Sequence, residues 1–385
     1  MSALRYFIGF LALNVALIGE CQSLPQTIVW FLCMFHCRDV ICSLTIAWVK
    51  VSLERDGMKR HMLFAFMALS LLAIRATAAD TASITVGLIS TTNAEDTQKR
   101  WQPLLNDLAA DTKLKVKVIA STNYSDIVNG LKSNKIQVAW MGSTMALSAV
   151  IDGKAVVFAQ MVKEGGATGY NSVLVTQTNS AIKSLGDITG TPGLYSFADG
   201  DPESTSGHLI PDYYIFARNK LDPQKQFKKV IVGNHQKNLQ AIVNNEVDVA
   251  TNNTGELERL KKEAPDQYAK VRVFWTSPEI PLDPLLYRVD LPGDTKAKLE
   301  HFFYTYGTQN NPAHAAVLDK ILNLSGFKAS TNAQLEIVAK LESFSQLRSN
   351  ANNTKLSDEQ KKKAEEDIND HLKKLEAVIG APGAK

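Results

Sequence analysis

An eight-residue segment, GDPESTSG at residues 200 to 207, combines turn-forming residues with three consecutive hydroxyl side chains. It follows an apolar, strand-like run and precedes HLIPDYYIFA, which predicts a helix. Because Gly and Pro turn the chain, Ser204, Thr205 and Ser206 are expected at the start of that helix. The first N–H groups of a helix lack partners and carry partial positive charge, so this segment could bind an anion without a basic side chain.

The donors of this segment suit a tetrahedral ligand with several oxygens, since hydroxyls and N–H groups can surround it. The simpler alternative is a helix cap made by one serine, with the other hydroxyls idle. A nucleotide P-loop is excluded because no Gly-Lys-[Ser/Thr] follows. Asp201 and Glu203 are expected as turn and first-turn residues, not as metal ligands.

The residues around this segment do not form a convincing catalytic set. His208 and His235 are candidate bases, but no G-x-S-x-G motif or metal-binding His pair accompanies them. His235 follows the strand-like VIVGN at the start of another predicted helix, where it could donate a hydrogen bond to a bound anion. An ordinary helix-start residue is the equal alternative. We therefore expect a binding protein, with no enzyme activity, metal or cofactor.

The first 79 residues differ from the rest of the chain. Residues 58–79, MKRHMLFAFMALSLLAIRATAA, have a basic start, an apolar run and a small-residue triplet, the pattern of a cleaved secretory signal peptide. We expect Met58 to be the natural start and residues 1–57 to be a non-native extension. The alternative is a membrane anchor, although its apolar runs are shorter than the roughly 20 residues of a spanning helix.

Cysteines and net charge also separate the N-terminal part from the remainder. All four cysteines precede Met58, so the predicted exported chain has none and cannot form a disulfide. The formal charge of +3 arises before residue 80, because the later residues carry 35 basic and 35 acidic side chains. A neutral exported chain gives no reason to expect nucleic acid or an acidic membrane as a partner.

From Ser83 onward, short β-branched runs such as KVKVIAS and VIVGN alternate with helical patterns such as HQKNLQAIVNNE. This alternation predicts an α/β protein with parallel-rich sheets flanked by helices. Small or amide residues occupy two strand-end loops, Gly142-Ser143-Thr144 and Thr251-Asn252-Asn253-Thr254. Because strand ends surround the ligand crevice of open α/β sheets, we expect the binding site there.

Residues 351–385 predict a C-terminal helix. Ser357 and Gln360 match a capping box. One apolar stripe follows, made of Ala364, Ile368, Leu372, Leu375 and Ile379. The stripe either packs on its own domain or joins two chains in a homodimer; its narrowness among many charges favours the homodimer.

Residues 83 to about 350 resemble the periplasmic phosphonate-binding proteins of phosphonate ABC importers, especially those for 2-aminoethylphosphonate. The matching blocks are GDPESTSG with HLIPDYYIFA, VGNHQKNLQAIVNNEVDVATNNT, GYNSVLV, IQVAW with its following Gly, and SPEIPLDP. The resemblance implies a two-lobed, type II binding protein, with lobe one at 80–173 and 277–350 and lobe two at 174–276. It also implies a periplasmic receptor that captures an organophosphonate, expected to be 2-aminoethylphosphonate, and delivers it to an inner-membrane permease.

Site residues follow from the same resemblance. It implies that the phosphonate oxygens are held by Tyr124, Ser204, Thr205, Ser206 and His235. Tyr170 would line the cleft, and Asp283 would meet the ammonium group of the substrate.

One departure from the family pattern affects the amine end. Gly255 follows the NNT block where the aminoethylphosphonate binders have Glu, and Glu256 comes one residue later. A shift of one residue at a helix start turns a side chain by about 100 degrees, which puts the reach of Glu256 in doubt. The alternatives are a receptor for a phosphonate or tetrahedral oxyanion without an amine, and a membrane-anchored sensor domain of the same fold.

Overall fold

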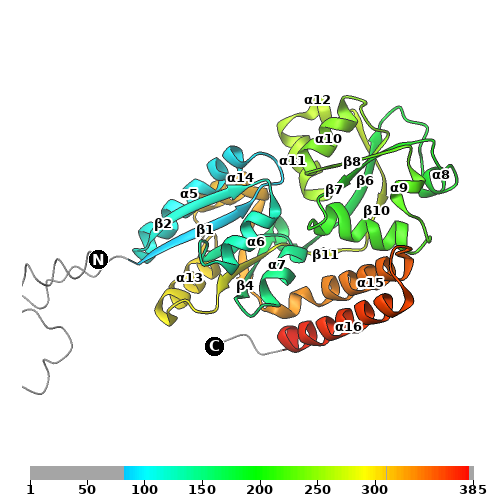
Figure 1. The fold of residues 1–385 in the computed structure, drawn as a ribbon. Coiled ribbons are helices and arrows are strands. Elements are labelled where there is room, and N and C mark those ends of the chain that lie inside the picture. The colour runs from blue at the N-terminus through cyan, green and yellow to red at the C-terminus, as the bar shows by residue number, and fades with distance from the viewer. Residues whose placement is uncertain (1–81, 309, 381–385) are drawn as a thin grey trace, which may run out of the picture. The chain divides into compact units, whose positions relative to one another are not determined.

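Most strands of the described residues form two mixed sheets with helices packed on them (Figure 1). The computed structural model describes residues 82–308 and 310–380, all within one compact unit. The predicted extension at 1–57, the signal peptide at 58–79 and the four cysteines lie outside the described residues.

The first sheet has six strands in the order β13-β4-β12-β3-β1-β2. Their bounds are β1 (Ser83–Ile89), β2 (Lys115–Ser121), β3 (Val138–Trp140), β4 (Ala155–Lys163), β12 (Pro284–Arg288) and β13 (Leu324–Ala329). Its helices are α5 (Ala94–Thr112), α6 (Tyr124–Lys132), α7 (Ser143–Val150), α13 (Gly293–Thr305) and α14 (Pro312–Leu322). α5 buries one apolar face, which includes Trp101, Leu104 and Leu108.

The second sheet has five strands in the order β10-β6-β9-β7-β8. They are β6 (Ser172–Gln177), β7 (Ser196–Gly200), β8 (Lys229–Gly233), β9 (Val249–Asn253) and β10 (Val271–Thr276). The α-helices along this part are α8 (Leu185–Thr189), α9 (Pro223–Gln226), α10 (His235–Val243), α11 (Thr254–Glu263) and α12 (Pro265–Tyr268). Two π-helical segments, η2 (Thr205–Leu209) and η3 (Asp212–Ala217), follow β7.

Both faces of the second sheet are buried, as alternation along β6 shows. Val173 and Val175 pack in a cluster with residues of α10 and α11, which include Leu239 and Leu257. Leu174, between those valines, packs in a different cluster with Phe197, Ile215, Phe216 and Phe227. Helical segments therefore cover the sheet on two sides, as the sequence pattern predicts.

The two sheets are mixed, not mainly parallel. β1 pairs in parallel with β2 and β3, and β7 with β8 and β9. β4, β6, β10, β12 and β13 pair antiparallel to their neighbours. β6 and β12 each enter from the other sheet and are not part of a βαβ unit, so they have no requirement to run parallel. Local alternation of strand and helix does not reveal such strands.

The chain passes from the first sheet to the second near Tyr170 and returns after β10. At these points β5 (Gly169–Tyr170) pairs antiparallel with β11 (Ile280–Pro281). The two passages between the sheets therefore lie beside each other at this short two-stranded pairing. The lobe boundaries at 80–173, 174–276 and 277–350 stay a prediction.

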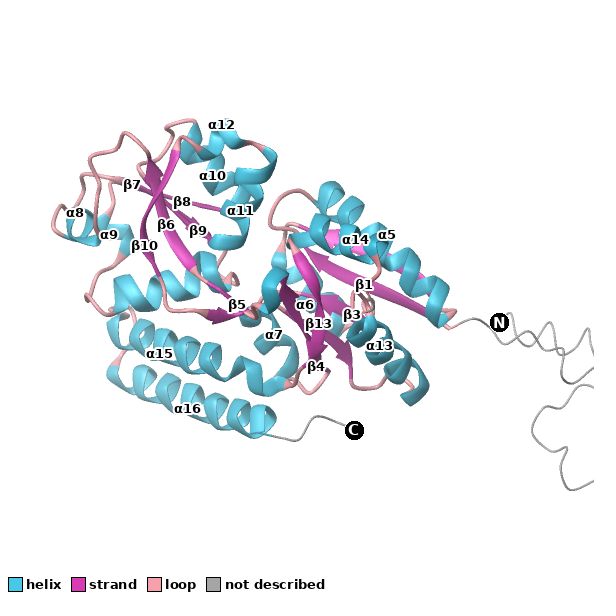
Figure 2. Cartoon of the chain, turned by 180° about the vertical axis from the view of Figure 1, so that it is seen from behind, coloured by secondary structure: helices cyan, strands magenta, loops and turns pink. Residues whose placement is uncertain are grey.

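The C-terminal segment forms two neighbouring helices, α15 (Glu336–Asn352) and α16 (Asp358–Gly380), visible side by side in Figures 1 and 2. Short segments η1 (Glu164–Gly166) and η4 (Asn332–Leu335) complete the described elements. α15 touches both parts of the molecule, since it packs on α7 of the first sheet and η3 of the second. Arg348 of α15 pairs with Asp212 of η3 at 2.6 Å.

The capping box at the start of α16 is confirmed. The Ser357 N–H donates to Gln360 Oε1 at 2.9 Å, and the Gln360 N–H donates to Ser357 Oγ at 3.3 Å. The apolar stripe lies toward the rest of its own chain: α16 packs on α15, and Leu375 and Ile379 are buried. This removes the reason for expecting a homodimer, because the sequence pattern does not show that α15 covers the stripe.

Candidate functional site

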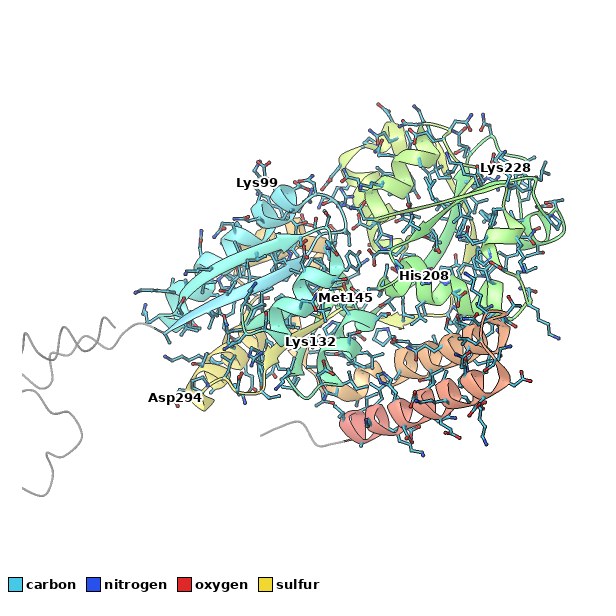
Figure 3. All side chains as sticks on the ribbon, in the orientation of Figure 1. Lys99, Lys132, Met145, His208, Lys228 and Asp294 are labelled. Carbon is cyan, nitrogen blue, oxygen red and sulfur yellow. The ribbon has the colours of Figure 1, made fainter. Side chains whose placement is uncertain are left out.

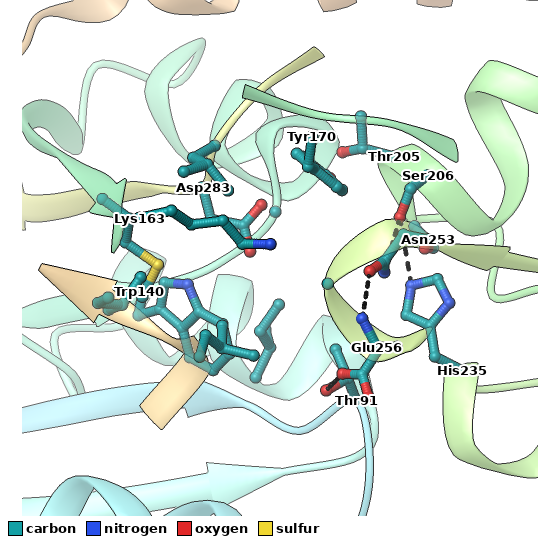
Figure 4. A pocket seen from close by; sticks show the side chains of 18 of the residues that line it. Thr91, Trp140, Lys163, Tyr170, Thr205, Ser206, His235, Asn253, Glu256 and Asp283 are labelled. Atoms are coloured by element: carbon teal, nitrogen blue, oxygen red, sulfur yellow. Dashed lines mark hydrogen bonds between the residues drawn. The ribbon is translucent and has the colours of Figure 1, made fainter. Parts of the chain in front are cut away.

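A cavity of about 60 Å³ is lined by residues from both sheets and their connections. Its wall contains all eight predicted site residues: Tyr124, Tyr170, Ser204, Thr205, Ser206, His235, Glu256 and Asp283. Figure 4 shows Thr205, Ser206 and His235 on one side of the pocket, and Trp140, Lys163 and Asp283 on the opposite side. We call these the anion end and the substituent end; Ser204 and Tyr124 belong to the anion end.

The segment that forms the anion end is a tight turn followed by a helix start. Ser204 is the N-cap, and its Oγ accepts the Gly207 N–H at 3.0 Å. A Cβ on Gly200 would overlap the backbone of Gly207, so the strand end and the helix start meet backbone to backbone. The helix continues as π-helical turns, which recur at functional sites.

Ser204, Thr205 and Ser206 are each at most 5% exposed, yet only Ser204 serves as a cap. Thr205 Oγ1 accepts the Thr144 N–H at 2.9 Å, which links the second sheet to α7 of the first. Ser206 Oγ lies 3.3 Å from His235 Nε2. The alternative of one capping serine with two idle hydroxyls is therefore wrong, since all three hydroxyls take part in a polar cluster.

The ring side chains at the anion end are buried and uncharged. Burial lowers the pKa of His235, against the opposing effect of the nearby Glu256 carboxylate, so its imidazole is neutral near pH 7. Burial raises the pKa of the Tyr124 phenol well above its usual range and does the same for Tyr170. Each ring can therefore donate a hydrogen bond without carrying charge.

Glu256 lines the cavity, but its carboxylate has partners within the protein. Thr91 Oγ1 donates to Glu256 Oε1 at 2.6 Å, and Arg259 Nη2 lies 2.7 Å from Oε2. Burial would raise the pKa of Glu256, but Arg259, His235 and Thr91 together hold it below the usual value. The two oxygens are thus engaged at a position that Figure 4 shows beside Thr91.

Asp283 is the carboxyl group of the substituent end. Burial raises its pKa to about 7, although nearby donors on Trp140 and Tyr170 act in the opposite direction. The Trp140 N–H lies close enough to influence this pKa but makes no hydrogen bond of good geometry within the described residues. Burial therefore holds Asp283 near the midpoint between its acid and its carboxylate forms at neutral pH.

Several cavity residues were missed by sequence reasoning. Thr91, Trp140, Lys163 and Asn253 all line the wall. Asn253 ends a strand-end loop that the sequence marked as a place to look, and its amide donates to Ser206 Oγ at 3.4 Å. Lys163 stands at the end of β4 without any motif around it, so no local signal could have identified it.

Polar contacts between the two sheets border this cavity. Arg100 Nη1 of α5 lies 2.7 Å from Glu263 Oε1 of α11. The Asn234 amide before α10 donates to the Thr92 carbonyl at 2.8 Å. Contacts of this kind close the cavity between two parts of the fold.

His208 has a structural partner instead of a place in the cavity wall. Its Nδ1 lies 2.9 Å from Asp199 Oδ2 at the end of β7; Figure 3 labels His208 on η2. Burial lowers the pKa of His208, but Asp199 outweighs it and the net shift is upward. Asp201 and Glu203 act as turn residues, as predicted: the Glu203 N–H donates to Asp201 Oδ1 at 2.9 Å.

Residues 82–308 and 310–380 contain neither a cluster of metal-ligating side chains nor a membrane-spanning helix. No group of three or more His, Cys, Asp or Glu side chains in this part of the chain could hold a metal ion. Likewise, none of the described helices is both long and apolar enough to cross a membrane.

Known proteins match most of this chain. The family model described as "ABC transporter, phosphonate, periplasmic substrate-binding protein" matches residues 86–335. The phosphonates-binding periplasmic protein of Escherichia coli K12 is 35% identical over 302 residues, which are 78% of this chain and 88% of the relative.

Solved structures agree with that match. A binding protein component of an ABC phosphonate transporter from Pseudomonas aeruginosa is 38% identical, with a TM-score of 0.71 over 78% of this chain and 98% of its own. A Prochlorococcus marinus protein in complex with methylphosphonate is 22% identical, with a TM-score of 0.60 over 67% and 96%, and supports the fold. The fold is that of type II periplasmic binding proteins, as predicted. The chain belongs to the family of periplasmic substrate-binding proteins of phosphonate ABC transporters.

Proposed function

We propose that this cavity binds one organophosphonate, with the phosphonate oxygens at the anion end and the substituent directed toward Asp283. Hydrogen bonds would come from Ser204, Thr205 and Ser206, the backbone N–H groups at the start of η2, and the side chains of Tyr124 and His235. The observation that carries the proposal is the convergence of these buried donors on one cavity.

The chemistry of the anion end supports reversible capture. All its side-chain donors are neutral, and fixed neutral dipoles stabilise an anion strongly once water is excluded. Because none of the described residues that line this end is a lysine or arginine, opening of the two parts would expose the anion to water and weaken its binding. The Thr205 to Thr144 hydrogen bond joins the two parts beside the phosphonate position, which favours coupling of closure to ligand capture.

The identity of the substituent has two candidates. 2-Aminoethylphosphonate, which the family resemblance implies, would place its ammonium group near Asp283. A phosphonate without an amine is favoured by one specific observation: both oxygens of Glu256 are already engaged by Thr91 and Arg259. A carboxylate in a buried ion pair is a poor partner for a second cation, because its charge is largely neutralised.

The transport role places the protein between the outer solution and an inner-membrane permease. Family members are substrate-binding transport proteins, and relatives are periplasmic. We infer that this chain is exported after cleavage near Ala79 and delivers its ligand to the permease of an ABC importer. The intact mass of protein recovered from the periplasmic fraction tests this: a mass that includes residues 1–57 would instead support a membrane-anchored domain.

Calorimetry tests the ligand class. Protein purified from cells that express the full chain is titrated with methylphosphonate, ethylphosphonate, 2-aminoethylphosphonate, phosphate and sulfate. We expect at least one phosphonate to bind about tenfold more tightly than sulfate, which is about 1.4 kcal/mol. Failure of every phosphonate to bind would contradict the proposed function.

A further inference from the structure

Lys163 places a positive charge at the substituent end of the cavity. Its side chain is 12% exposed and projects from the end of β4 into the pocket, as Figure 4 shows. Among the described residues that line this cavity, it is the one lysine, and arginine is absent from the lining. Lys163 and Tyr170 also line an adjoining, larger cavity near Glu258 and Asn323.

Gly255 makes room for this lysine. A Cβ built on Gly255 would lie 3.7 Å from Lys163 Nζ and 3.3 Å from Asn253 Oδ1. A side chain longer than alanine at this position would therefore compete with the ammonium group for space. Lys163 pairs with Glu258, whose side chain is half exposed to water, so two of its three N–H donors are left for other acceptors.

The groups around Lys163 are also hydrogen-bond donors. Trp140 is only 3% exposed. Its indole N–H is buried and makes no hydrogen bond of good geometry among the described residues. The raised pKa of Asp283 adds an O–H donor when this carboxyl is protonated. Glu256 is held by Arg259 and Thr91. The half-exposed Glu258, in contrast, pairs with Lys163 and offsets part of its charge. The substituent end thus offers the Lys163 cation and the Trp140 N–H and, below about pH 7, the O–H of Asp283 to a ligand group that lies between them.

We propose that Lys163 gives the cavity a preference for phosphonates whose short substituent ends in a carboxylate over those that end in an ammonium group. The inference rests on the proposed function and refines its substrate class. A carboxylate would accept hydrogen bonds from Lys163 Nζ and Trp140 Nε1, whereas an ammonium group would meet a like charge and a row of donors.

A matched ligand series tests this proposal by calorimetry. 2-Carboxyethylphosphonate, 2-aminoethylphosphonate and ethylphosphonate share the same two-carbon chain and differ only at its end. We expect the protein from the full chain to bind the carboxylate at least about tenfold more tightly than the amine. Lys163→Met should abolish this preference, and Lys163→Arg should keep most of it. Lys262→Met is the matched control, since Lys262 pairs with Asp319 outside the cavity, and it should keep the preference.

Gly255→Glu gives an independent test that leaves Lys163 in place. The new carboxylate would lie beside Lys163 Nζ, neutralise it and reverse the preference toward 2-aminoethylphosphonate. If ethylphosphonate binds but the carboxylate binds no more tightly than the amine, the inference about Lys163 is wrong while the proposed function stands. If none of the three phosphonates binds, the proposed function itself fails.

Discussion

The two ends of the cavity differ in the charge of the side chains that line them. The anion end consists of neutral donors on η2, with Tyr124 and His235 beside them. The substituent end combines Lys163 with Asp283, whose pKa burial raises to about 7. Neutral donors give binding without a large penalty for burying charge, whereas buried charges discriminate sharply between substituents at a cost in stability.

This contrast indicates where affinity and specificity reside. Changes at the anion end should weaken every phosphonate alike, because all share the same three oxygens. Changes at the substituent end should alter the order of preference or the stability of the empty protein. Four predictions test the separation, in decreasing order of expected effect.

Asp283→Asn should stabilise the empty protein at pH 8. The pKa of Asp283 is higher in the folded protein than in the unfolded chain. Stability of the folded protein is therefore highest below about pH 4, where this carboxyl is protonated in both states, and falls as pH rises to about 7. Removing the charge should recover at most about 4 kcal/mol at pH 8. Thermal unfolding between pH 4 and pH 8 measures the gain in stability of the variant, and the exposed Asp111→Asn is the control. A gain at pH 4 equal to that at pH 8 would contradict the raised pKa of Asp283.

Arg259→Met should destabilise the fold by about 3 kcal/mol, because it leaves the buried carboxylate of Glu256 without its cation. The double variant Glu256→Gln with Arg259→Met should recover most of the loss. Urea unfolding provides the measurement. Lys340→Met removes a fully exposed pair with Glu336 and should leave the midpoint unchanged. A double variant no better than the single one would show that the ion pair is not the cause.

Thr205→Val should lower affinity for methyl-, ethyl- and 2-aminoethylphosphonate by a similar factor, about tenfold or more. The substitution keeps the shape and removes the hydroxyl that bonds the Thr144 N–H. Thr176→Val, which removes another buried threonine hydroxyl of the second sheet, is the matched control for folding. Calorimetry with all three ligands measures the loss of affinity. A loss for only one ligand would contradict the proposal that the anion end contributes equally to the binding of every phosphonate.

His208→Gln should have the smallest effect on binding, because His208 bonds Asp199 and is outside the cavity wall. Asp199 raises the pKa of His208 above its unfolded value against the effect of burial. The pair therefore stabilises the fold fully below about pH 6, and the contribution is lost as pH rises through the raised pKa. Thermal unfolding of both proteins should show a gap at pH 6 that narrows by pH 9.

Much of the anion end could be predicted from local sequence. Three hydroxyls after a Gly and Pro turn predict a helix start, and Ser204 is indeed the N-cap. The neighbouring strand-end loop already contained Asn253. Such features depend on residues close in the chain, where backbone geometry and capping chemistry are local.

The substituent end could not be predicted in this way. Asp283 and Gly255 were named through the family resemblance, but Lys163 at the end of β4 was not, and no short motif links it to the other two residues. The hydrogen bond from Thr91 to Glu256 could not be predicted from local sequence either, because the two residues are 165 positions apart. The packing of α16 on α15, which removes the reason for expecting a dimer, also depends on the tertiary structure.

The sequence by itself determined the α/β class and the helix start at Ser204 with its three hydroxyls, because periodicity, turns and capping act over a few residues. Tyr124 was named only through the family resemblance. Tertiary structure alone decided which strands run antiparallel, which carboxylates are neutralised and that a lysine stands beside Gly255. Those outcomes depend on burial and on contacts between distant segments, and both arise only when the two sheets are packed together.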